Sequence, residues 1–429
     1  MKEMSKIVLQ NIEALLPGGK VEKTSIAIEG NTIAAIGAVP QNWQPDMIID
    51  GTEKLAVPGF VNSHTHAAMT LFRSYADDML LMDWLQSKIW PAEANLTSDD
   101  VYWGTQLAIA EMIKSGTTTF MDMYFFMPEV AKAVQQSGIR AVLSRGMAGI
   151  APTAQQALTE SEELYNQWHG GADGRITVML GPHAPYTCPP DYLAKVVDLA
   201  HKLNCEIHIH LAETADEVKT CYDKYGKSPI ALMNDIGVFD CGTLAAHCVH
   251  LSPSDIEIMA PKGVRVAHNP GSNMKLASGI APIPELLSAG IVTGLGTDGA
   301  ASNNNLDMVE EIRLAALLHK VNRLDPLLIP AATAIDMATC QGAKAVGLGN
   351  ITGKIAPGYR ADITIVDMHA SHWYPRHERA SLLVYSASSA DVHTVIVDGK
   401  ILLDNHRLTT IDEDKLMAEV QQRGMRLVK

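Results

Sequence analysis

The middle of the chain alternates short apolar runs with longer amphipathic stretches. The apolar runs have the length of buried strands, and the stretches between them, for example 99–115, 191–203 and 252–260, repeat apolar positions at helical spacing. Eight strands are predicted, at residues 55–62, 117–122, 140–145, 176–181, 206–210, 243–247, 265–268 and 293–298. This repeated unit of strand and helix favours a closed (β/α)₈ barrel of the TIM type over an open doubly wound sheet.

The two ends of the chain have a different pattern, in which β-branched residues lie between Gly and Asn turns. Short strands are predicted at 6–12, 20–29 and 32–36, and again at 362–366 and 393–398, where Asp398-Gly399 marks a hairpin turn. We therefore expect a small composite β-sandwich domain built from residues 1–55 and 351–429, around a catalytic barrel domain at residues 56–350.

Polar or ionisable residues follow nearly every predicted barrel strand. They are His64, His66, Asp122, Arg145, His183, His210, His247, His268 and Asp298. One such residue is an ordinary way to enter a loop, but the carboxyl ends of all barrel strands meet at one rim, where barrel enzymes keep their chemistry. The repetition therefore predicts an active site at that rim.

His64 and His66 follow an apolar strand and are two residues apart. In an extended segment this spacing places both imidazoles on one face, where they can reach one cation. The spacing alone is weak evidence, since His208 and His210 repeat it. The position of His64 and His66 at a strand end is what favours a metal site.

Other strand ends supply the remaining ligands and the groups that transfer protons. His210 and Asp298 complete a set of three imidazoles and one carboxylate, which suits one divalent metal, Zn²⁺ first and Fe²⁺ second. A structural zinc is usually closed by cysteines, so the lack of a Cys cluster favours an open, catalytic site. His208 and His268 are interpreted as supporting residues rather than ligands.

The run from residue 58 to residue 66, with His210, His247 and Asp298 at strand ends, resembles the amidohydrolase superfamily. The resemblance covers nearly the whole chain, including the tail segment at 353–362. His183 stands where binuclear members carry a carboxylated lysine, which implies a single metal.

Within that superfamily the chain is similar to the branch of the 5-methylthioadenosine/S-adenosylhomocysteine deaminases and the chlorotriazine hydrolases. The deaminase similarity includes Trp84, Glu93, Arg145, His183, Glu213 and Asp298. It implies that Glu93, Arg145 and His183 contact a nucleoside, and a carboxylate at Glu93 suits the ribose diol. Taken without the resemblance, Glu93 is also explained as a loop residue, Arg145 as half of an ion pair and His183 as a core histidine. The apolar stretch 69–84 is explained either as a thioether pocket or as core packing.

The resemblance implies hydrolytic loss of the 6-amino group of an adenine nucleoside. In that hypothesis a metal-activated water attacks C6, Glu213 protonates N1, and Asp298 with His247 passes a proton to departing ammonia. The cytidine-deaminase type of site needs a CxxC motif that this chain lacks. Two alternatives stay open: another hydrolysis on this scaffold, such as triazine dechlorination or guanine deamination, and a non-catalytic homologue of the barrel.

The composition of the chain disfavours some classes of binding partner. The chain carries 34 Lys and Arg against 48 Asp and Glu, which gives a net charge of -14. This negative charge disfavours binding to nucleic acid. No apolar run is long enough to cross a membrane, and six scattered cysteines favour a reduced, cytoplasmic protein. A small-molecule nucleoside is the expected partner, and a homo-oligomer is left open.

Overall fold

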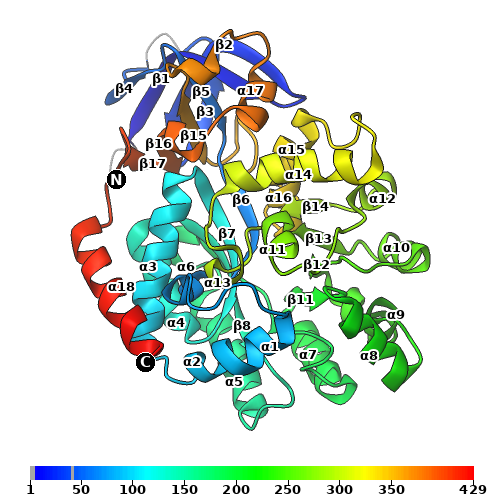
Figure 1. Cartoon of the computed structure of the whole chain (residues 1–429). Helices are drawn as coiled ribbons and strands as arrows, with labels where there is room; N and C mark the ends of the chain where they lie inside the picture. The colour runs from blue at the N-terminus through cyan, green and yellow to red at the C-terminus, as the bar shows by residue number, and fades with distance from the viewer. Residues whose placement is uncertain (1–4, 40–42) are drawn as a thin grey trace.

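The computed structural model describes residues 5–39 and 43–429, and its centre is a parallel barrel (Figure 1). The barrel strands are β6 (Phe60–Thr65), β7 (Thr117–Tyr124), β8 (Arg140–Met147), β9 (Ile176–Val178), β10 (Gly181–Pro182), β11 (Ile207–Leu211), β12 (Thr243–His247), β13 (Arg265–His268) and β14 (Thr293–Leu295). They pair in two parallel groups, β6 to β10 and β11 to β14. A bridge between Leu180 and Ile207 joins the groups on one side, and Asp298 N donates to His64 O at 3.0 Å on the other. The predicted barrel is therefore confirmed.

Two predicted strands are each divided in the structure. The prediction of one strand at 55–62 was wrong. β5 (Lys54–Pro58) pairs with strands of the terminal sheet, and β6 begins the barrel after Gly59. A Cβ atom at Gly59 would lie 2.2 Å from Thr118, so the chain changes sheets where only glycine fits. Both halves are buried, and hydrophobicity alone therefore gives no sign of the change. The strand predicted at 176–181 is likewise interrupted, between β9 and β10.

Strands from both ends of the chain pair in one sheet, seen at the top of Figure 1. Its members are β1 (Lys6–Leu16), β2 (Lys20–Glu29), β3 (Thr32–Ile36), β4 (Met47–Asp50), β5, β15 (Ile363–Asp367), β16 (Val392–Val397), β17 (Lys400–Asp404) and β18 (Arg407–Leu408). β5 lies between β1 and β15, and apolar side chains of both ends share one core cluster. The composite terminal domain is confirmed as a feature of the fold, whereas its boundaries at 55 and 351 stay predictions.

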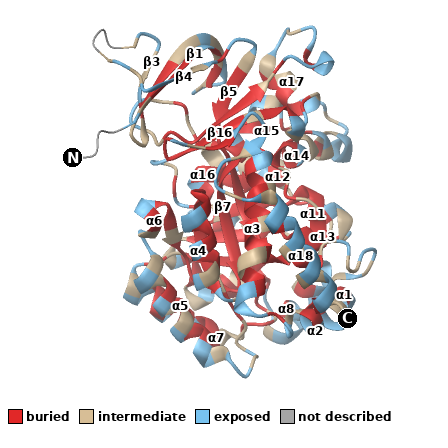
Figure 2. Cartoon of the chain, turned by 90° about the vertical axis from the view of Figure 1, so that its left-hand side faces the viewer, coloured by how far each residue is buried: buried red, intermediate tan, exposed pale blue. Residues whose placement is uncertain are grey.

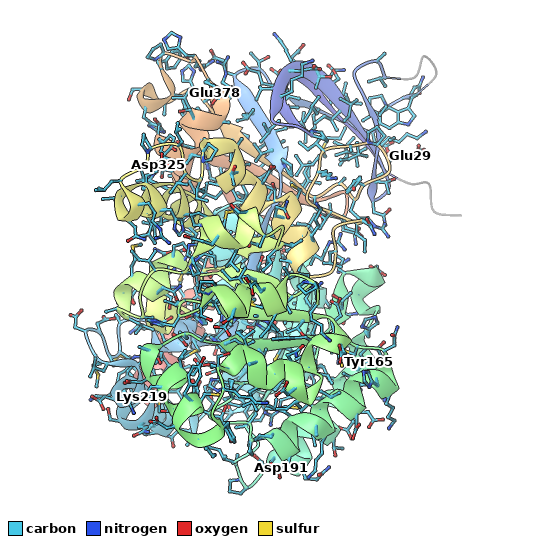
Figure 3. All side chains as sticks on the ribbon, turned by 90° about the vertical axis from the view of Figure 1, so that its right-hand side faces the viewer. Glu29, Tyr165, Asp191, Lys219, Asp325 and Glu378 are labelled. Carbon is cyan, nitrogen blue, oxygen red and sulfur yellow. The ribbon has the colours of Figure 1, made fainter. Side chains whose placement is uncertain are left out.

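Helices surround the barrel, with buried strands inside and exposed outer faces (Figure 2). The longer helices are α3 (Ser98–Lys114), α4 (Met127–Ser137), α5 (Ala154–Trp168), α7 (Pro190–Leu203), α8 (Ala215–Tyr225), α9 (Pro229–Ile236), α10 (Pro253–Met259), α14 (Met308–Arg323), α15 (Ala331–Ala338), α17 (Arg379–Tyr385) and α18 (Glu413–Leu427). Side chains such as Asp191 and Lys219 project from these outer faces into solvent (Figure 3). The segment before α3 forms two short helices, α1 (Leu81–Trp84) and α2 (Trp90–Glu93), joined by a π-helical turn.

A buried ion cluster connects the barrel to the terminal sheet. Arg140, at the start of β8, donates from Nε to Asp362 at 2.9 Å and from a terminal nitrogen to Asp398 at 3.2 Å. All three side chains are almost completely buried. The carboxylates hold the pKa of Arg140 above its usual value despite burial, which by itself would lower the pKa. The two units are thus held in one orientation by charge pairs away from solvent.

Candidate active site and metal centre

A cavity of about 580 Å³ opens at the carboxyl ends of the barrel strands. Its walls contain nearly all the predicted site residues: His66, Trp84, Glu93, Arg145, His183, His210, Glu213, His247 and Asp298. His64, the remaining predicted site residue, is completely buried and lies beside them, with its ring 4.9 Å from that of His66. The structure therefore brings together residues that are up to 234 positions apart in the chain, from His64 to Asp298.

The tautomer of His64 is determined by a chain of hydrogen bonds behind the site. His208 Nδ1 lies 3.1 Å from the carbonyl oxygen of Leu244, to which only a protonated nitrogen can donate. His208 Nε2 is then an acceptor for His64 Nδ1–H, 2.8 Å away. This leaves His64 Nε2 without a proton. Burial lowers the pKa of His64 to about 4, which also keeps its ring neutral.

His66 and His210 are oriented by backbone carbonyl groups in the same way. Nδ1 of His66 donates to Met123 O at 2.6 Å, and Nδ1 of His210 donates to His183 O at 2.7 Å. Their Nε2 atoms then face each other at 3.3 Å, both available as electron-pair donors. Two lone pairs at this separation repel unless a proton or a cation lies between them.

Asp298 follows β14 with a positive φ of 60°. Its Oδ2 accepts from Ser272 Oγ at 2.6 Å and its Oδ1 from Gly299 N at 2.8 Å. The same Oδ1 lies 3.4 Å from Nε2 of both His64 and His66. Burial alone would raise the pKa of Asp298, but the adjacent histidines, His64 first, hold this pKa well below its usual value.

These atoms fit a metal ion. The ligand atoms of His64, His66 and Asp298 lie within 4.8 Å of one another, as do those of His64, His210 and His247. His64 Nε2 is buried and makes no hydrogen bond to any residue that the structure describes. A buried nitrogen acceptor with no partner is rare in proteins, and a divalent cation would satisfy it. Burial lowers the pKa values of His64 and His210, and the pKa of Asp298 is also held low. Neutral rings at these two histidines and an ionised carboxylate are the protonation states that a metal requires.

Glu213 and His247 lie beside this centre. Oε2 of Glu213 is 3.8 Å from Nε2 of His247, and both side chains are almost completely buried. Burial raises the pKa of Glu213. Burial would lower the pKa of His247, but the neighbouring charges of Glu213 and Asp298 raise it. Nδ1 of His247 lies 2.9 Å from Asn273 Oδ1, which directs Nε2 towards the cavity.

Glu93 lies at the end of α2 and meets Tyr124 of β7, whose hydroxyl donates to Glu93 Oε1 at 2.6 Å. Burial raises the pKa of this carboxyl to about 7, although the tyrosine hydrogen bond opposes the shift. Tyr124 was not among the predicted site residues, because an aromatic residue within an apolar strand gives no functional signal. Its position as the last residue of β7, two residues beyond the predicted strand end, is the only indication.

Arg145, His183 and Trp84 also line the cavity, each with a partner in the protein. Nε of Arg145 donates to Glu160 at 2.8 Å. Nδ1 of His183 lies 2.9 Å from Thr187 Oγ1, and burial lowers the pKa of His183 to about 3. Trp84 Nε1 donates to the carbonyl oxygen of Ala76 at 3.0 Å. A neutral His183 with one nitrogen engaged can still present the other to a ligand.

The apolar stretch at 69–84 was explained either as a thioether pocket or as core packing, and the structure supports both explanations. Met69, Leu81 and Trp84 line the cavity. Met69 and Trp84 also belong to the core cluster that contains Leu71 and Phe72. Two further methionines of the wall, Met123 and Met147, come from β7 and β8 and lay outside that prediction.

The sequence comparisons agree on one family. A family model described as the amidohydrolase family matches residues 55–402. The chain is 55% identical over 431 residues to a protein of Pelotomaculum thermopropionicum named 5-methylthioadenosine/S-adenosylhomocysteine deaminase, and the match covers 99% of each chain.

Solved structures give the same result for the fold. A crystal structure described as an adenosine deaminase from Xanthomonas campestris with bound zinc superposes with a TM-score of 0.95 at 35% identity, covering 99% of both chains. An atrazine chlorohydrolase from Arthrobacter aurescens, complexed with zinc, has a TM-score of 0.91 at 23% identity, covering 97% of this chain and all of the other. At that identity the second comparison bears on the fold alone. Across residues 5–39 and 43–429, no helix is both long and apolar enough to span a membrane.

Proposed function

This chain belongs to the amidohydrolase family, and from that premise we propose that its cavity binds adenine nucleosides and hydrolyses their 6-amino group. The substrates are 5′-methylthioadenosine, S-adenosylhomocysteine or both, and the products are the inosine analogues and ammonia. The observation that carries the proposal is that a metal-ligand cluster and a half-buried carboxylate, Glu93, line the same cavity.

One divalent ion is assigned to His64, His66, His210 and Asp298, with His247 directed at the reacting water. The supporting evidence is the set of unprotonated Nε2 atoms and the zinc in the 35%-identical structure. When bound, such an ion supplies a water of lowered pKa near neutral pH. Zn²⁺ is the first candidate and Fe²⁺ the second, and metal analysis of the purified protein distinguishes them.

The remaining residues move protons around the purine. As the water oxygen bonds to C6, Asp298 accepts one water proton and Glu213 donates a proton to N1. The C6–N6 bond then breaks, and Asp298 delivers its proton to the amine through His247, so that ammonia leaves. The hydroxyl proton on C6 returns to Glu213, which leaves a carbonyl group at C6 and a proton on N1. The raised pKa of Glu213 suits a proton donor at neutral pH.

The sugar is held away from the metal. Oε1 of Glu93 accepts from Tyr124, and its second oxygen is available to a ribose hydroxyl. His183 presents a ring nitrogen to the base, while Arg145 and Trp84 border the region for the 5′ substituent. Met69, Met123 and Met147 are suited to contact a thioether, since their side chains are apolar and adaptable.

The alternatives are disfavoured by particular residues. A triazine or a free guanine base has no diol, and the buried Glu93 carboxyl would then face the cavity without a partner there. A non-catalytic homologue would not be expected to retain every ligand together with Glu213 and His247. A cytoplasmic location stays a proposal that six unpaired cysteines support. The expected absence of nucleic-acid and membrane partners, and the homo-oligomer, stay predictions.

A panel of candidate substrates tests the proposal. The panel contains 5′-methylthioadenosine, S-adenosylhomocysteine, adenosine, adenine, guanine and atrazine. Loss of an amino group, or of chloride from atrazine, is followed by ultraviolet absorbance. We expect the thioether nucleosides to react fastest. Faster turnover of guanine or atrazine than of every nucleoside would contradict the proposal.

A further inference from the structure

Glu217, in the first turn of α8, is a buried acid that takes no part in the proposed proton transfers. Its side chain is 6% exposed, and its two oxygens accept from consecutive backbone groups, Ala212 N at 2.8 Å and Glu213 N at 2.9 Å. No Lys, Arg or His among the described residues forms an ion pair with it. Burial raises the pKa of Glu217 to about 7, against the effect of these two hydrogen bonds.

The carboxylate of Glu217 closes a strained turn directly before Glu213. Ala212 has a φ of 51°, in the left-handed region that non-glycine residues rarely adopt. Its carbonyl oxygen accepts from Val249 N at 3.0 Å and from His250 N at 2.9 Å, both in the loop that follows His247. The turn therefore connects the segment of Glu213 to that of His247, and the Glu217 carboxylate satisfies the two N–H groups that the turn leaves inside.

These bonds differ from those of an ordinary helix cap. The cap residue of α8 is Thr214, whose hydroxyl accepts from Glu217 N at 3.1 Å. In a capping box the acidic side chain would return to the backbone N–H of the cap residue itself. Here it reaches past Thr214 to the two residues before it, and one of them is the proposed proton donor.

We propose that Glu217 is a positioning residue for Glu213, one that holds the backbone of Glu213 so that its carboxyl faces the reacting base. An anionic carboxylate can accept two N–H groups at once, whereas an amide presents one oxygen and one N–H₂ group. Glu217→Gln would set a donor against a backbone donor and displace the turn. A shift of about 1 Å in a catalytic group can cost about 10²-fold in rate.

A double-mutant cycle tests this inference, which rests on the proposed role of Glu213. The enzymes compared are wild type, Glu217→Gln, Glu213→Gln and the double variant, each loaded with metal and assayed with 5′-methylthioadenosine. Asp216→Asn is the matched control, because it removes the same charge from the same helical turn at an exposed position. Metal content and the thermal midpoint are measured for each protein.

We expect Glu217→Gln to lower kcat by about 10–100-fold, with KM within about threefold and the metal content unchanged. In the Glu213→Gln background the same change should cost less than about twofold, because Glu217 acts through Glu213. Equal losses in both backgrounds, or a wild-type kcat in Glu217→Gln, would overturn the inference. Full activity of Glu213→Gln alone would instead refute the proposed function of Glu213.

If Glu217→Gln does not fold, Glu217→Asp takes its place in the cycle. This variant keeps the charge but is one methylene too short to reach both N–H groups. The same non-additive loss of kcat is expected, and an additive one would contradict the positioning role.

Discussion

Tyr124 donates its phenolic hydrogen to Glu93 at 2.6 Å, and this contact joins the short helix α2 to barrel strand β7 at the cavity wall. The pairing orients a carboxyl group that the surrounding apolar side chains would otherwise leave unsupported. Because Tyr124 occupies Oε1 of Glu93, only Oε2 can accept from a diol. The affinity of the site for a diol therefore depends on whether the Glu93 carboxyl group is ionised. Glu93 is therefore the residue through which pH should affect substrate binding.

The pKa of Glu93, raised by burial to about 7, predicts how binding depends on pH. Below that pKa the neutral carboxyl is a weak acceptor, and above it the carboxylate accepts charge-assisted hydrogen bonds from the ribose. The KM for 5′-methylthioadenosine should fall as the pH rises from 6 to 8, by roughly tenfold at most. Initial rates across this pH range measure the effect. The 2′,3′-dideoxy analogue and the Glu93→Gln variant are the controls, and the same slope in either would contradict the assignment.

Glu93→Ala should separate nucleosides from the free base. Charge-assisted hydrogen bonds to the ribose are worth about 1.5–3 kcal/mol, which corresponds to a loss of roughly one to two decades in kcat/KM for 5′-methylthioadenosine. Residual turnover of adenine should barely change, since adenine has no ribose. Equal losses for the two substrates would mean that Glu93 supports the fold or the metal instead.

Replacing His66 with Ala should remove metal and activity together. His66 supplies a ligand nitrogen from the rim, and its loss leaves the neighbouring imidazoles to hold the ion with too few donors. Metal analysis of the dialysed protein, beside a circular dichroism spectrum that shows the barrel intact, provides the measurement. A full equivalent of tightly bound metal in His64→Ala/His66→Ala would refute the ligand assignment.

Glu213→Gln keeps the shape of the side chain and removes its proton. General acid–base groups contribute roughly 10²–10⁴-fold, so kcat should fall by at least that range while the metal content stays constant. Steady-state kinetics with 5′-methylthioadenosine measure the loss. A variant within about threefold of wild type would show that N1 receives its proton from another group.

The parts of the site that were predictable from sequence are those at strand ends. His64, His210, His247 and Asp298 each follow a recognisable apolar strand, and barrel geometry then places them together. The family resemblance added Glu93, for which hydrophobic periodicity gave no evidence, and a substrate-binding role for Arg145, which the strand pattern had already placed at the rim. The contact of Arg145 with Glu160 agrees with the ion-pair explanation left open for it, although its side chain also lines the cavity.

Other features depend on contacts that a linear pattern does not contain. Tyr124 and Asn273 act through hydrogen bonds to site residues 31 and 26 positions away. Glu217 has the pattern of an ordinary helix start, and only its burial and its two backbone partners distinguish it. The division of the strand at Gly59 was missed because both of its halves are buried and the apolar run continues across it.

The most direct test of the central claim is the fate of the 6-amino group when the metal-loaded protein meets 5′-methylthioadenosine in oxygen-labelled water. We predict that one ammonia is released for each nucleoside consumed, and that mass spectrometry finds 5′-methylthioinosine with the label on C6. A chelated sample and the Glu213→Gln variant should release ammonia far more slowly. Consumption of the nucleoside with release of free adenine, or an unchanged nucleoside in the presence of bound metal, would contradict the account.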